Sequence, residues 1–233
     1  MFSYRKVSLL GVLVLFNYGV SAQGACFTLV GQTAPDFKAQ AVVDGQIKDI
    51  SLADFEGKNK ILLFYPADFS FICPTELFAM QEKLSELQEK NTVILAISVD
   101  QIYTHQKWLE TPKQGGGIKG ITYPILSDVT KKISHAYQAL DPQKGIALRA
   151  TILIDKNNII QASAVYNTDI GRSDTEILRV LDALLFTQEH GQVCPANWEK
   201  GQIGMEASKK GLKSYLENKN SLKNNEKNTI EKG

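Results

Sequence analysis

The hydrophobic positions of this chain fall into continuous apolar runs and into stretches with helical spacing. Lys60–Tyr65 and Thr92–Val99 are nearly continuous apolar runs, the pattern of strands that are buried on both faces. Between them, from Pro74 to Lys90, apolar residues recur every three or four positions and mark one buried helical face. A strand, a helix and a second buried strand in this order predict a parallel crossover unit. We therefore expect an α/β fold.

The second half of the chain predicts a change in the direction of the strands. Ala150–Asp155 and Ile159–Tyr166 have the pattern of strands, and the polar link 156–158 between them is short enough to force an antiparallel hairpin. The central sheet is therefore expected to be mixed. The other predicted elements are a short helix at Gln101–Leu109, a short strand at Tyr123–Leu126, a helix at Thr130–Leu140 and an amphipathic helix at Asp174–Gln188.

Length and composition favour one globular unit with appendages. A chain of 233 residues with 43% hydrophobic content can bury a full core and fits one domain better than two. The end of the chain is rich in Lys, Asn and Glu, has almost nothing to bury, and is expected to be disordered. We expect an N-terminal extension over 1–27, a globular domain over 28–189, a C-terminal arm over 190–217 and a polar tail over 218–233.

The N-terminal extension has the form of a secretory signal peptide. Arg5 and Lys6 precede the apolar run Val7–Phe16, and Val20–Ala22 offers small residues for cleavage. The apolar run is too short for a membrane anchor, which needs about 20 residues. Cleavage would place the protein in the periplasm or a secretory lumen. The alternative is an uncleaved apolar extension on a cytoplasmic protein.

Charge and cysteine content exclude several classes of function. The 26 basic and 25 acidic residues leave a net charge of +1, so we expect no nucleic-acid partner. The three cysteines, Cys26, Cys73 and Cys194, are too few for a disulfide scaffold, and with the three histidines they show no metal-ligand spacing. We therefore expect no metal site. Cys26 lies just after the predicted cleavage site, and we assign it no role.

Cys73 stands where a central strand gives way to a helix, in the segment Phe64–Glu76. Ligand sites in open α/β sheets favour such carboxyl-terminal strand ends. Pro74 suits the first turn of a helix, because its missing N–H would have no partner there. The sulfur would then face unpaired backbone donors and the positive end of the helix dipole, which favour a reactive thiolate.

The neighbourhood of Cys73 leaves alternatives open. A cysteine can be no more than a small buried hydrophobe, and its apolar neighbours would raise its pKa unless a cation compensates. Arg149 begins a buried strand, where a guanidinium should face an anion; otherwise it reaches water at the strand end. Ser70 either donates a hydrogen bond to a bound oxygen or caps the helix. The apolar neighbours are Phe69, Phe71 and Ile72.

Other thiol chemistries have less support in the sequence. A cysteine hydrolase needs a histidine to activate the thiol. His135 and His190 are predicted to lie on helix surfaces or ends, and we assign neither a catalytic role. A thiol-disulfide isomerase would carry a CxxC pair, and this chain has none.

Four segments resemble one known family, the typical two-cysteine peroxiredoxins of the alkyl hydroperoxide reductase and thioredoxin peroxidase group. FYPADFSFICPTE carries Pro66, Ser70 and Cys73 at the family's positions, and the likeness runs from about residue 28 to about 217. Four linked motifs in order are far more specific than any one of them. The other three are GIALRATILID around Arg149, GRSDTEILRVLDAL around Arg172 and HGQVCPANWEKG around Cys194.

This resemblance implies a thioredoxin-like fold and a cysteine-based peroxidase. Cys73 would be the peroxidatic cysteine, which attacks hydrogen peroxide or an organic hydroperoxide and becomes a sulfenic acid. Cys194, from the other subunit of a homodimer, would be the resolving cysteine and form an intersubunit Cys73–Cys194 disulfide. The implied supporting residues are Pro66, which shields the site, Ser70 and Arg149, which hold the peroxide oxygens, and Glu76 and Arg172, which orient Arg149.

The resemblance also implies partners and a second activity. The electron donor would be thioredoxin or a flavoprotein disulfide reductase, acting by thiol-disulfide exchange. The dimers would form a ring of five, a decamer, and no metal, haem or flavin is expected in this chain. Rings in this family also act as holdase chaperones, which gives an alternative function beside or instead of peroxide reduction. The bacterial relatives are usually cytoplasmic.

Overall fold

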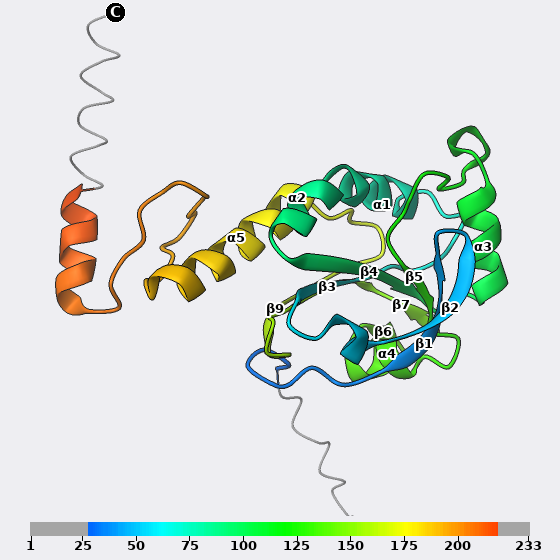
Figure 1. The fold of residues 1–233 in the computed structure, drawn as a ribbon, viewed down its shortest axis with the longest axis horizontal. Coiled ribbons are helices and arrows are strands. Elements are labelled where there is room, and N and C mark those ends of the chain that lie inside the picture. Colours follow the sequence, from blue (N-terminus) through cyan, green and yellow to red (C-terminus); the bar gives the residue numbers. More distant parts are fainter. Residues whose placement is uncertain (1–27, 219–233) are drawn as a thin grey trace, which may run out of the picture.

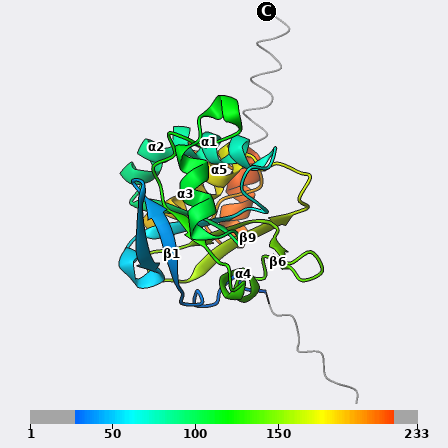
Figure 2. The same cartoon turned by 90° about the vertical axis from the view of Figure 1, so that its right-hand side faces the viewer.

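The computed structural model describes residues 28–218, and these residues form a mixed sheet of seven strands in the order β2-β1-β5-β4-β3-β8-β9. Helices cover both of its faces: α1, α2 and α5 lie on one side and α4 on the other (Figures 1 and 2). The predicted signal-peptide-like extension, Cys26 and the tail from 219 lie outside the described residues. No helix within 28–218 has the length and apolar character needed to cross a membrane.

The predicted crossover unit forms the centre of the molecule. β3 (Asn59–Phe64) and β4 (Thr92–Ser98) pair in parallel, and β3 is buried along its whole length. Alternate residues of β3 enter the two hydrophobic clusters on opposite faces, Ile61 and Leu63 toward α1 and α5, Leu62 and Phe64 toward α4. The predicted helix is two helices, α1 (Cys73–Glu82) and α2 (Leu84–Glu89), interrupted at Lys83.

The predicted hairpin is also present and makes the sheet mixed. β8 (Arg149–Ile154) lies antiparallel to both β3 and β9 (Ile160–Tyr166), and β9 is an edge strand. α5 (Asp174–His190) crosses the same face as α1. The remaining elements near the sheet are β5 (Ile125–Ser127), α3 (Ile102–Glu110), and the 3-10 turns η1 (Leu52–Phe55) and η2 (Lys113–Gly115).

Other parts of the fold also differ from the sequence-based expectation. The hairpin of β1 (Lys38–Val43) and β2 (Gln46–Ser51) was not predicted, because only part of each strand is buried. The helix expected over 130–140 is shorter: α4 spans Lys132–Ala136, and Gln138 turns the chain at φ +54°. Leu140 belongs instead to a two-stranded ribbon of β6 (Leu140–Asp141) and β7 (Ile146–Ala147).

The segment after α5 forms an arm beyond the end of that helix (Figure 1). Val193 and Met205 pair through two backbone hydrogen bonds, which close the arm into a loop. Trp198 is 2% exposed and packs against Phe186 of α5, with ring centroids 4.8 Å apart. Residues 209–218 are helical, which the sequence analysis did not anticipate. Packing on α5 therefore gives this arm a defined shape within one chain.

Candidate functional site

Cys73 is the first residue of α1, at the carboxyl end of β3. Ile72 is the N-cap residue and Pro74 occupies the first turn, as the position of the proline predicts. The thiol is completely buried, yet a guanidinium nitrogen, Arg149 Nη1, donates a hydrogen bond to Cys73 Sγ over 3.3 Å. The sulfur therefore faces a cation as well as the start of a helix. A cysteine that only filled space would need neither.

Arg149 is buried, with 3% of its surface exposed, so the alternative that it reaches water at the strand end is wrong. Its Nε donates to the Thr168 carbonyl at 2.7 Å, and its Nη1 donates to Glu76 Oε2 at 2.9 Å as well as to the Cys73 sulfur. A guanidinium held at several points has one orientation. That orientation directs it at Cys73.

Glu76 joins the two arginines. Arg172 donates to Glu76 through its backbone N–H, its Nε and its Nη2, over 2.8 to 3.0 Å. Burial raises the pKa of Glu76, but the hydrogen bonds of Arg172 and the charges of both arginines outweigh it, so the net pKa lies below its ordinary value. This network therefore stabilises the fold above the ordinary glutamate pKa of about 4.3. The contribution is lost as pH falls through the lower pKa of the folded state.

The loop between β3 and α1 carries the other two predicted site residues. Pro66 is buried two residues after the end of β3. The Ser70 hydroxyl donates to the Ala67 carbonyl at 2.8 Å, within the loop. Ser70 does not cap the helix, because Ile72 is the N-cap residue, so the capping alternative is wrong. Ser70 lies three residues before Cys73 in the sequence.

The apolar neighbours of Cys73 do not bury it in the way the sequence analysis expected. Phe71 is 94% exposed, and Phe69 is 47% exposed with its ring 5.9 Å from that of Trp108, so neither ring belongs to the cluster that buries the sulfur. The sulfur is covered instead by the hydrophobic cluster under α1, which includes Leu77 and Met80. A loop has no periodicity from which the facing of each side chain can be derived, and the sequence therefore misplaced these rings.

Cys194 lies in the arm and is half-buried. Its Sγ lies 3.6 Å from the Ala183 carbonyl. Burial raises the pKa of the Cys194 thiol, and the charge of Arg179 opposes that rise. Ala183 lies 183 − 174 = 9 residues beyond the start of α5, roughly 13 Å along the helix. Cys73 lies instead near the start of α5, because Glu76 of the same helical turn is hydrogen-bonded to Arg172, just before α5. The structure therefore does not bring the two cysteines of one chain together.

Comparison with known proteins places this geometry in a family. The model of the AhpC/TSA family matches residues 30–163, and that of the C-terminal domain of 1-Cys peroxiredoxin matches residues 183–218. The 2-Cys peroxiredoxin BAS1 of Hordeum vulgare, a chloroplastic protein, is 45% identical over 81% of this chain and 90% of its own length. The chain is a 2-Cys peroxiredoxin of the AhpC/TSA family.

Two further relatives agree with this assignment. A thioredoxin peroxidase of Echinococcus granulosus is 42% identical over 81% of this chain and 97% of its own length. The crystal structure of a reduced 2-Cys peroxiredoxin from Plasmodium vivax superimposes with a TM-score of 0.80, at 45% identity, over 82% of this chain and 99% of that one. The thioredoxin-like fold and the thiol-dependent peroxidase activity predicted from the sequence are confirmed.

Sequence reasoning missed one polar cluster beside the peroxiredoxin site. Asp68, in the loop before Cys73, is hydrogen-bonded to the Tyr65 hydroxyl at 2.8 Å and to His105 Nδ1 of α3 at 2.7 Å. The side chains of Asp68 and His105 are almost completely buried. Helical spacing was the available signal, because His105 lies on the same helix face as Ile102 and Trp108, both of which are buried.

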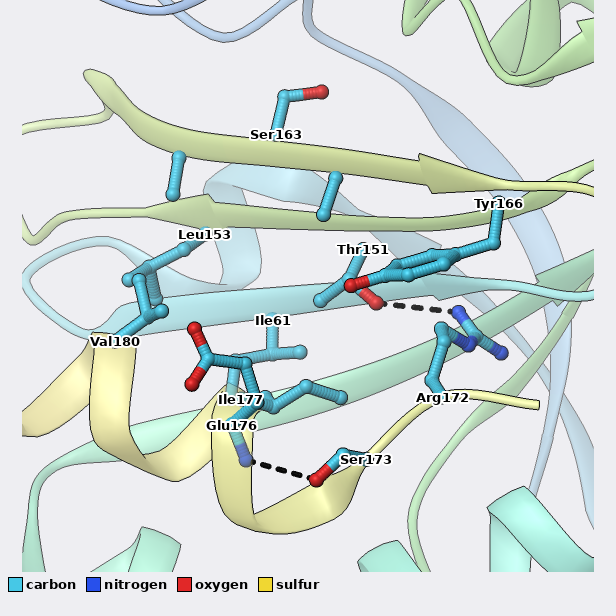
Figure 3. A pocket seen from close by; sticks show the side chains of 12 residues that line it. Ile61, Thr151, Leu153, Ser163, Tyr166, Arg172, Ser173, Glu176, Ile177 and Val180 are labelled. Carbon is cyan, nitrogen blue, oxygen red and sulfur yellow. Dashed lines mark hydrogen bonds between the residues drawn. The ribbon is translucent and has the colours of Figure 1, made fainter. Parts of the chain in front are cut away.

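A cavity of about 230 Å³ lies beside Arg172, between β8, β9 and the first turns of α5. Figure 3 shows Arg172 at one end of this cavity, hydrogen-bonded to Thr151, with the ring of Tyr166 above. Most of the lining is apolar, and Cys73 is not part of it. Within residues 28–218 no group of histidine, cysteine or carboxylate side chains has the arrangement of a metal site. The Cys73 sulfur and this cavity are therefore separate features.

Proposed function

We propose that Cys73 is the peroxidatic cysteine, acting on hydrogen peroxide and organic hydroperoxides. The observation that carries this proposal is the 3.3 Å hydrogen bond from Arg149 to the buried Cys73 sulfur. The thiolate attacks one peroxide oxygen and the O–O bond breaks. The other oxygen leaves as alkoxide or hydroxide, takes a proton and departs as alcohol or water. Cys73 is left as a sulfenic acid.

Arg149 and Ser70 would stabilise the charge that develops on the leaving oxygen. A guanidinium already directed at the sulfur needs little rearrangement to bind an oxygen beside it, which is the condition for strong electrostatic stabilisation. The Ser70 hydroxyl would exchange its bond to the Ala67 carbonyl for one to the peroxide. Pro66 is buried next to this site and would shield it from water. Positioning of Arg149 falls to Glu76 and Arg172, through the hydrogen bonds described above.

Cys194 of a second subunit would resolve the sulfenic acid. Its thiol attacks the Cys73 sulfur, water leaves, and an intersubunit Cys73–Cys194 disulfide forms. A disulfide requires the two sulfurs to come within about 2.05 Å. Within one chain Cys194 lies beside the middle of α5, away from Cys73. This separation favours a Cys194 thiol from another chain. The homodimer gains support from the edge strand β9, whose outer side is paired only at its start, where Ile160 exchanges backbone hydrogen bonds with residues 31 and 32.

The cavity between β9 and α5 gives this edge an uncovered apolar region. A second copy of the chain laid along β9 would pair the strand edge and cover that region at once. We extend the proposal to a ring of five such dimers. Identical dimer–dimer contacts repeated around a closed ring leave no contact surface unpaired.

A dithiol protein would reduce the disulfide by exchange, which regenerates both thiols. Thioredoxin is our first candidate, because the relative from Echinococcus granulosus is named a thioredoxin peroxidase. A flavoprotein disulfide reductase is the alternative donor. Every step from peroxide to regenerated thiol uses sulfur chemistry alone, so the proposal assigns no cofactor to this chain.

Substitution of Cys194 by serine tests the resolving role. One equivalent of peroxide should convert the native protein to a disulfide-linked dimer on a non-reducing gel, whereas Cys194→Ser should stay monomeric. The variant should consume its first equivalent at the native rate but should not turn over, because its sulfenic acid has no partner thiol. Cys26→Ser is the matched control and should dimerise like the native protein. A dimer that persists without Cys194, or disappears without Cys26, contradicts the assignment.

Amino-terminal sequencing of the mature protein tests the signal-peptide prediction. The segment 1–27 lies outside the described residues, so its chemistry must be measured directly. Cleavage after Ala22 would leave Gln23 as the first residue and place the enzyme in an exported compartment. An intact Met1 would contradict cleavage and favour the cytoplasm.

A further inference from the structure

The buried cluster around Asp68 ties the loop before Cys73 to three separate elements. One carboxylate oxygen accepts from the Tyr65 hydroxyl, at the end of β3, and the other lies 2.7 Å from His105 Nδ1 on α3. The second ring nitrogen, His105 Nε2, lies 3.2 Å from the Leu126 carbonyl on β5. His105 therefore bridges the loop to the sheet. Hydrogen bonds of this kind, buried and involving a charged partner, are among the stronger ones.

The backbone of the same loop is held as firmly as the side chain. The Asp68 N–H donates to Asp100 Oδ2 at 3.0 Å, and Ser98 fixes that carboxylate with a bond of 2.7 Å. The next residue, Phe69, has φ +51°, a left-handed conformation that a side chain other than glycine rarely adopts. Such a turn persists only where its surroundings hold it. Here the contacts of Asp68 supply that hold.

The catalytic cycle requires this loop to open. Cys73 is completely buried, and the disulfide with Cys194 demands that its sulfur leave the site. While the loop stays closed, the sulfenic acid remains beside Arg149, where a second peroxide can bind. That peroxide oxidises it to a sulfinic acid and leaves as water or alcohol. The stability of the closed loop therefore determines how much of the sulfenic acid becomes the Cys73–Cys194 disulfide and how much becomes sulfinic acid.

We propose that the hydrogen bond between His105 and Asp68 holds the loop 66–72 closed and so sets the ratio of disulfide to sulfinic acid formed at Cys73. Both are positioning residues, since neither touches the sulfur. The inference rests on the proposed function, because it needs Cys194 as the competing nucleophile. A weaker bond should favour opening, faster disulfide formation and less sulfinic acid.

Two variants with amide side chains test the two hydrogen bonds of His105 one at a time. His105→Asn places its amide nitrogen near the position of Nδ1 and can keep the bond to Asp68. His105→Gln reaches the position of Nε2, keeps the bond to the Leu126 carbonyl and loses Asp68. Native and variant proteins are cycled with thioredoxin, thioredoxin reductase and excess hydrogen peroxide, and mass spectrometry counts sulfinic Cys73 per turnover.

We expect His105→Gln to form roughly tenfold less sulfinic acid per turnover, the size that follows from losing one hydrogen bond to a charged group. His105→Asn should stay within about twofold of the native protein by the same reasoning. Equal behaviour of the two variants, or more sulfinic acid in His105→Gln, overturns the inference. If His105 served only to fill the core, its replacement by Asn and by Gln would change the sulfinic acid yield to the same extent.

A second variant and a measurement of the disulfide distinguish failure of this inference from failure of the proposed function. If His105→Gln does not fold, Asp68→Asn weakens the same bond from the other side and should also lower the sulfinic yield. If the native protein forms no Cys73–Cys194 disulfide, the proposed function fails. If that disulfide forms but the yield is unchanged in both His105→Gln and Asp68→Asn, only the role of the His105–Asp68 bond fails.

Discussion

Replacing Cys73 with serine will reduce peroxide turnover to the uncatalysed background, a loss of more than about 10³-fold. A serine hydroxyl stays protonated at neutral pH where a thiol ionises, and only the anion attacks the O–O bond. The fold should survive, because oxygen replaces sulfur at nearly constant shape and the Glu76–Arg172 pair does not depend on the thiol. Stopped-flow measurement of peroxide consumption, beside a thermal unfolding curve, checks both halves of this expectation.

Cys194→Ser is the matched comparison, since it removes a thiol of the same chain without touching the attacking atom. It should still consume one equivalent of peroxide, while Cys73→Ser consumes none. Turnover that survives in Cys73→Ser would refute the mechanism. The same variant separates the holdase alternative, because suppression of client aggregation by Cys73→Ser would be independent of catalysis.

The central part of this fold follows from its sequence because burial on both faces leaves a strong pattern. β3 and β4 each contain a continuous apolar run, Ile61–Phe64 and Val93–Ile97, and apolar residues recur every three or four positions in the helical segment between them. β1 and β2 leave no such pattern, since the edge of the sheet exposes about half of their side chains. Helix length at α4 was overestimated because its end depends on one residue, Gln138, in a left-handed conformation.

The candidate site divides in a similar way. A lone arginine at the start of a buried strand predicts an anionic partner, and Arg149 indeed points at Cys73. The Asp68–His105 pair was missed because its members are 37 positions apart in the sequence and meet only through packing of α3 on the sheet. The bond of Arg172 to Glu76 spans 96 positions. Local patterns do not reach that far, and for this pair only resemblance to a family supplied the expectation.

Arg149→Met will lower the second-order rate constant for peroxide by about 10²- to 10³-fold, the range found when one preorganised donor is removed from a developing charge. The loss should concern chemistry more than folding. Glu76 keeps three hydrogen bonds from Arg172 in the variant, so its carboxylate is not left unpaired in the interior. Single-turnover stopped flow measures the rate constant, and circular dichroism checks the fold.

Arg149→Lys separates charge from geometry. An ammonium keeps the positive charge but lacks the planar fork that reaches the Thr168 carbonyl, the Cys73 sulfur and Glu76 together. We expect Arg149→Lys to recover only part of the rate of peroxide reduction. In both the lysine and the methionine variant, the rate of Cys73 alkylation by iodoacetamide should fall less than the rate of peroxide reduction, because alkylation breaks no O–O bond. A methionine variant within about threefold of the native rate would exclude the role that geometry gives Arg149, since removing a preorganised donor should cost far more. Equal losses in alkylation and peroxide reduction would mean that Arg149 acts on the sulfur alone and not on the leaving oxygen.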